Sequence, residues 1–61
     1  MMIKEAYHID LELLEKLAEG DYYWRQSYKF YCEICDKSVD WLTDRQADRL
    51  YKMEKNLQEA G

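Results

Sequence analysis

The chain has 61 residues, with thirteen acidic and nine basic side chains and a formal net charge of −4. Apolar residues make up 48% of it and aromatic residues 15%, too large a share for an intrinsically disordered protein. The length excludes a second domain, so residues 1–61 are expected to form one domain with a small core. The acidic balance disfavours general nucleic-acid binding and favours a positively charged protein partner.

The start of the chain shows no secretion signal, because Met1, Met2 and Ile3 are followed at once by Lys4 and Glu5. No apolar run approaches the roughly 18 residues of a membrane span. We therefore expect a cytoplasmic protein without a membrane partner.

The first nine residues fit neither a strand nor a helix pattern consistently, and we expect an extended or frayed lead-in. Asp10 is a good N-cap and is followed by leucines at helical spacing, which predicts a first helix over residues 10–19. Gly20 suits the C-terminal cap of this helix. Asp21 can cap the next helix directly, so the two helices are expected to run antiparallel.

Residues 21–42 hold seven of the nine aromatic residues and both cysteines, without Gly or Pro. The pattern predicts a long central helix over about residues 21–41, with two adjoining apolar stripes. The first stripe contains Trp24, Tyr28, Tyr31, Cys32, Cys35, Val39 and Leu42. The second stripe contains Tyr23, Phe30, Ile34 and Trp41. One partner helix cannot cover both stripes.

The third helix has the clearest start signal, a capping box with Thr43 as N-cap and Gln46 as the third helical residue. Apolar residues recur at helical spacing after it, and Gly61 ends the helix. Asp48 and Lys52 are i,i+4 neighbours on its charged face. The fold class is therefore all-α, as a small three-helix bundle or a helical hairpin with a short first helix.

A basic stripe on this third helix contains Arg45, Arg49 and Lys52. Such a stripe can contact phosphates or an acidic protein surface. Asp44 and Asp48 dilute its charge, so a solvated face of mixed sign is the alternative interpretation.

The segment Cys32-Glu33-Ile34-Cys35, with its flanks, resembles the first knuckle of a two-Cys two-His zinc finger. The expected histidine positions hold Asp48 and Lys52 instead, and the sole histidine, His8, lies upstream. A zinc site would therefore need a carboxylate as a further ligand, or a dimer that pools two cysteine pairs. We favour the interpretation in which both cysteines are small apolar residues on an unbroken helix, and we predict no metal and no cofactor.

The sequence also lacks the signals of an enzyme. His8 has no nucleophile placed beside it by sequence, and acidic pairs such as Glu12 and Glu15 are typical of a solvated helix face. The two glycines are too far apart to form a phosphate-binding loop. We predict a protein without catalytic residues.

The aromatic residues exceed what so short a helical core readily hides, and Tyr and Trp are enriched at binding hot spots. We predict that the second stripe, with Tyr23, Phe30, Ile34 and Trp41, binds a protein partner. A second copy of the chain, in a homodimer, is one such partner. The alternative is that the two other helices cover one stripe each.

The segment Asp40-Trp41-Leu42-Thr43-Asp44-Arg45-Gln46, followed by Leu50, Met53 and Leu57, resembles a helical module of small bacteriophage and prophage proteins, Leu-Thr-x-x-Gln with a periodic apolar helix. The resemblance transfers no functional residue. It implies a phage-type inhibitor or modulator that binds and blocks a host protein, such as a polymerase, a regulator or a defence nuclease. Two alternatives stay open: a zinc-stabilised nucleic-acid-binding module that uses Cys32 and Cys35, and a structural subunit of a larger assembly.

Overall fold

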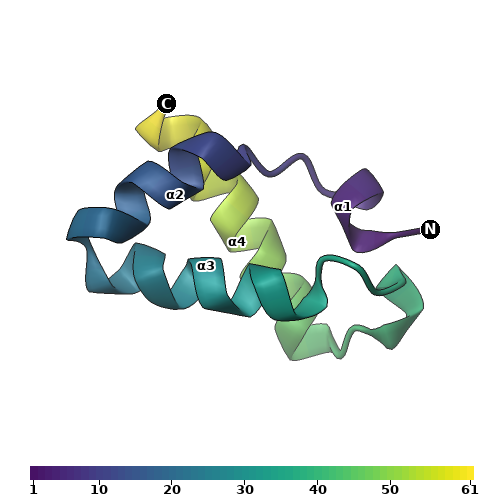
Figure 1. The fold of residues 1–61 in the computed structure, drawn as a ribbon. Coiled ribbons are helices and arrows are strands. Elements are labelled where there is room, and N and C mark those ends of the chain that lie inside the picture. The colour runs from purple at the N-terminus through teal and green to yellow at the C-terminus, as the bar shows by residue number, and fades with distance from the viewer.

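The computed structural model describes all 61 residues as a small all-α bundle (Figure 1). The elements in chain order are α1 (Ile3–Ala6), α2 (Leu11–Gly20), α3 (Tyr22–Ile34), the 3-10 turn η1 (Val39–Trp41) and α4 (Asp44–Ala60). The predicted all-α class is confirmed, and α2, α3 and α4 correspond to the three predicted helices. No helix combines the length and the apolar character needed to cross a membrane.

Aspartate caps create the hairpin of α2 and α3, as predicted. The Asp10 carboxylate accepts the Leu13 N–H at 3.1 Å, and the Asp21 carboxylate accepts the Tyr23 N–H at 2.9 Å. The two helices fold back on each other and run antiparallel (Figure 1). The prediction that Gly20 caps the C-terminal end of α2 is wrong. Gly20 is the last residue of the helix, Asp21 is its C-cap, and no glycine has a positive φ.

The central helix is shorter than predicted, because α3 ends at Ile34 rather than near residue 41. Residues 35–38 turn away from the helix axis, and the Lys37 N–H donates to the Ile34 carbonyl at 2.9 Å. Ser38 is the N-cap of η1, and its hydroxyl oxygen accepts the Asp40 N–H at 3.3 Å. The segment after Cys35 is polar and contains Asp and Ser, which form turns readily.

The start of the chain holds this turn in place. Met2 and Ser38 form an antiparallel bridge. Two backbone hydrogen bonds of 2.9 Å flank it, from the Ile3 N–H to the Lys37 carbonyl and from the Val39 N–H to the Met1 carbonyl. The Ile3 side chain is 0% exposed. The expectation of an extended or frayed lead-in is therefore wrong for residues 3–6, which form α1 and pack Ile3 into the core, whereas Met2 and Tyr7 on either side of α1 have extended backbones.

The capping box of α4 is present as predicted. The Thr43 hydroxyl oxygen accepts the Gln46 N–H at 3.1 Å, and the Gln46 side-chain oxygen accepts the Thr43 N–H at 3.0 Å. The predicted i,i+4 pair is also present, with 3.0 Å between Lys52 Nζ and an Asp48 oxygen. Gly61 caps the C-terminal end of α4.

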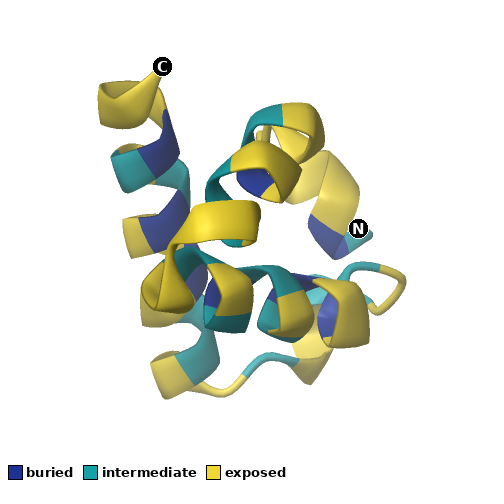
Figure 2. Cartoon of the chain, turned by 60° about the vertical axis from the view of Figure 1, so that its left-hand side comes forward, coloured by how far each residue is buried: buried dark blue, intermediate teal, exposed yellow.

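The core is small, since only eight residues of the chain are buried. Seven of them form one apolar cluster that draws on all four α-helices: Ile3, Leu14, Tyr31, Ile34, Leu50, Met53 and Leu57. Ser27 is the eighth. Figure 2 shows the buried sides of the helices turned toward one another and the exposed sides turned outward. With so few buried residues, the loss of any one should weaken the whole fold.

The packing of the N-terminal segment can be tested at Ile3. We expect Ile3→Val to lower the free energy of unfolding by about 0.5–1.5 kcal/mol and Ile3→Ala by about 2–5 kcal/mol, because each leaves a cavity at a fully buried site. Urea unfolding followed by circular dichroism gives both values. Lys4→Ala is the matched control, because Lys4 is an exposed neighbour, and should change stability by less than about 0.5 kcal/mol. Unchanged stability of Ile3→Ala would contradict the packing described here.

Candidate functional site

A groove of about 530 Å³ lies between α3 and α4 and is the largest hollow on the surface. Two aromatic side chains of α3 and five polar or charged side chains of α4 line it: Tyr23, Phe30, Arg45, Gln46, Asp48, Arg49 and Lys52. The groove therefore brings together two of the residues predicted to bind a partner and the whole predicted basic stripe. We call it the α3–α4 groove.

Side chains rather than backbones span the space between these two helices. The Arg49 guanidinium carbon lies 4.3 Å from the centroid of the Phe30 ring. Further along, the Asn56 amide donates a hydrogen bond of 3.1 Å to the Tyr23 hydroxyl. The closest backbone packing in the molecule is between α2 and α3. The backbones of α3 and α4 approach each other at few points, and the groove lies between their side chains.

Positive charge predominates in the groove. Asp48 is its only acidic lining residue, and its carboxylate is paired with Lys52 at 3.0 Å. Neither Arg45 nor Arg49 forms a salt bridge with a carboxylate of the chain. Two unpaired guanidinium groups therefore lie at the groove of a protein whose net charge is −4.

The four residues of the predicted partner-binding stripe do not form one surface. Tyr23, which is 49% exposed, lines the groove together with the half-buried Phe30. Ile34 is only 6% exposed and belongs to the core, so its burial removes it from the predicted binding surface. Trp41 lies on η1 with 72% of its surface exposed, and it does not line the groove. The break after Ile34 explains the position of Trp41, whereas Ile34 lies on α3 itself and is buried on the same side as Ser27 and Tyr31.

The other apolar stripe of α3 faces α2. The Tyr28 hydroxyl donates a hydrogen bond of 3.2 Å to a Glu15 carboxylate oxygen. Hydrogen bonding and charge interaction with the Cys32 side chain raise the pKa of Tyr28, and Glu15 adds to the effect. Burial raises the pKa of Tyr31 above its ordinary value of 10.0, and the nearby cysteines raise it further.

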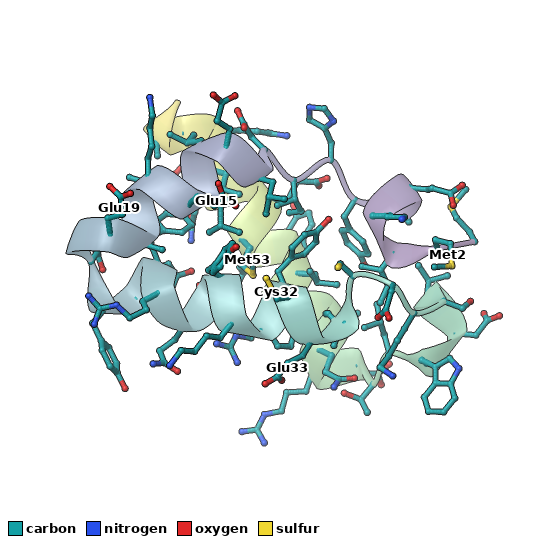
Figure 3. All side chains as sticks on the ribbon, viewed as in Figure 1. Met2, Glu15, Glu19, Cys32, Glu33 and Met53 are labelled. Carbon is teal, nitrogen blue, oxygen red and sulfur yellow. The ribbon has the colours of Figure 1, made fainter.

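The two cysteines differ in their surroundings, and only Cys35 lies as predicted. Cys32 is exposed on α3, whereas Cys35 is half-buried at the C-cap and packs against the core, so the core assignment is wrong for Cys32. Figure 3 shows Cys32 and Glu33 on opposite sides of α3. Both thiols are free, and no group of three or more His, Cys, Asp or Glu side chains is arranged to hold a metal ion. A single chain therefore supplies no complete zinc site of the kind considered from sequence.

Sequence patterns missed two large exposed aromatic side chains. Tyr22 is 73% exposed, and Tyr51 is 59% exposed although it lies at helical spacing with apolar residues of α4. Leu50 and Met53 occupy the core instead, each with 0% exposure. Whether Tyr51 is buried therefore depends on how α4 is oriented against the other helices, and the spacing of residues along α4 does not determine this orientation.

Comparisons with known proteins identify no relative of this chain. No protein-family model matches it, and neither do curated proteins or solved structures. Inference about function therefore depends on the residues and their geometry.

The raised pKa of Tyr31 predicts a pH dependence of stability. A phenol whose pKa is higher in the folded state stabilises the fold while it is protonated, and this contribution is lost as pH rises through the folded-state pKa. Between about pH 9 and about pH 11.5 we expect the wild type to lose more stability than Tyr31→Phe, which keeps the ring but cannot ionise. Urea unfolding at a series of pH values measures this. Identical profiles would contradict the prediction.

Zinc content separates the remaining metal hypothesis from a metal-free protein. Under reducing conditions we expect less than about 0.3 equivalents of zinc per chain by elemental analysis, because even a site shared in a dimer needs about half an equivalent. The double variant Cys32→Ser/Cys35→Ser gives the background. A wild-type content above half an equivalent that this variant loses would establish a shared site.

Proposed function

We propose that this chain is a non-enzymatic protein-binding protein that contacts its partner through the α3–α4 groove. The observation that carries the proposal is the juxtaposition of two aromatic side chains, Tyr23 and Phe30, with the basic stripe of α4 in one groove. Tyrosine, phenylalanine and arginine are enriched at the centres of protein interfaces, and truncation of such residues often costs most of the affinity.

The chemistry of the groove supports binding rather than catalysis. Its lining contains no serine, cysteine or histidine, and its one carboxylate, Asp48, is paired with Lys52 at 3.0 Å. His8 lies elsewhere, beside α4, where its backbone N–H donates to a Glu54 carboxylate oxygen at 2.6 Å. The exposed Cys32 neighbours the Tyr28 phenol and does not line the groove.

The small core gives a second argument for a partner. A chain with eight buried residues is only marginally stabilised by its own packing, and a partner that binds the folded state adds stability by mass action.

The resemblance of residues 40–57 to phage helical modules supports a narrower form of the proposal. In that form the protein is a phage-type inhibitor or modulator that binds and blocks a host protein.

The proposed contact surface can be tested by affinity capture from host lysate with matched tyrosine variants. We expect Tyr23→Ala to recover the partner at least about tenfold less well than the wild type, because Tyr23 lines the groove. Tyr22→Ala is the control, since Tyr22 is the more exposed neighbour outside the groove. Trp41→Ala shows whether η1 also contacts the partner. Circular dichroism confirms that each variant folds, and equal recovery of every partner by Tyr23→Ala and the wild type would contradict the proposal.

A further inference from the structure

The two arginines of the α3–α4 groove point to the chemistry of its occupant. We propose that the occupant is an acidic segment of another protein, whose carboxylates pair with Arg45 and Arg49 while an apolar side chain packs on Phe30 and Tyr23. This inference rests on the proposed function and narrows it from any protein partner to one with a negatively charged, partly apolar segment.

The position of Arg49 favours a carboxylate partner. Its guanidinium lies over the Phe30 ring, 4.3 Å from the centroid, a distance typical of a cation–π contact. Such a contact restricts the side chain while the N–H groups at the edge of the guanidinium remain able to donate. A guanidinium held in this way is preorganised for the two parallel hydrogen bonds of a carboxylate.

The spacing of the arginines suggests the form of the acidic segment. Arg45 and Arg49 are i,i+4 neighbours on α4, which places them about 6 Å apart along the helix axis. Two carboxylates at the same spacing on a partner helix would match them. Lys52 adds less charge than its position suggests, because Asp48 already pairs with it.

Nucleic acid fits the groove less well than an acidic peptide does. A duplex is bound through many phosphate contacts along its length, whereas the groove offers only two unpaired guanidinium groups. A second copy of this chain fits less well too. Its α2 presents Glu15 and Glu19 (Figure 3), but Glu15 already accepts a hydrogen bond from Tyr28.

The test uses two helical peptides of about 18 residues and the full-length protein labelled with ¹⁵N. One peptide carries Glu pairs at i,i+4 beside leucines, and the other has Gln in place of every Glu. We expect the Glu peptide to bind at least about tenfold more tightly than the Gln peptide and to shift the amide signals of Phe30 and Arg49. Its affinity should fall between about 50 mM and about 300 mM NaCl, because salt screens exposed charge pairs.

Two double variants that remove the same positive charge from different positions show which arginines or lysines bind the Glu peptide. The double variant Arg45→Gln/Arg49→Gln should bind the Glu peptide at least about tenfold more weakly. Lys29→Gln/Lys55→Gln removes the same charge from exposed positions outside the groove and should bind within about twofold of the wild type, since distant exposed charges contribute little.

Any of the following results would overturn the inference: no binding of the Glu peptide, an equal loss in both double variants, tighter binding of a short DNA duplex, or a shift of the groove signals with protein concentration alone. The last would identify a second copy as the occupant. Equal affinity for the Glu and Gln peptides would also overturn it, yet would leave protein binding through the groove intact, so the two proposals fail separately.

Discussion

Backbone pairing between the start of the chain and the segment after α3 is the constraint on which the rest of the structure depends. The bridge between Met2 and Ser38 joins residues far apart in the sequence, and its flanking hydrogen bonds engage the backbone of residues 37 and 39. It fixes the turn that ends α3 and inserts Ile3 into the core. The chain then enters α4 through η1, on a path that places α4 beside α3 with a groove between them.

The parts of the fold that sequence reasoning predicted are those with local signals. The side chains of Asp10, Asp21 and Thr43 each accept a backbone N–H two or three residues further on, so a short stretch of sequence contains the whole interaction. The end of α3 has a weaker local signal, the turn-forming residues Asp36 and Ser38. Apolar spacing continues past Ile34, and the pairing that stops the helix comes from the other end of the chain. A helix pattern alone could not predict it.

In the candidate site, too, some features follow from local sequence patterns and others do not. Periodicity placed Tyr23 and Phe30 on one helical stripe and the basic residues on another, and the structure joins these two stripes in one groove. The two stripes come together through tertiary packing, which neither pattern predicts. The break after Ile34 separates Trp41 from the first pair, because the predicted stripe requires a continuous helix. Ile34 and Cys32 lie before the break. The buried side of α3 contains Ser27, Tyr31 and Ile34, so it falls between the two predicted stripes and leaves Cys32 exposed.

The contact between Arg49 and Phe30 connects the stability of the free protein with its proposed binding. It contributes about 0.5–1 kcal/mol at an exposed site, and the guanidinium partly covers an aromatic ring that would otherwise face water. A carboxylate can pair with the edge of the same guanidinium without breaking this contact, because the ring occupies only one face. Less side-chain entropy is then lost on binding, since the arginine is already ordered. In the empty groove, Arg49 therefore partly covers the Phe30 ring, and its guanidinium is already ordered for a carboxylate of an acidic partner.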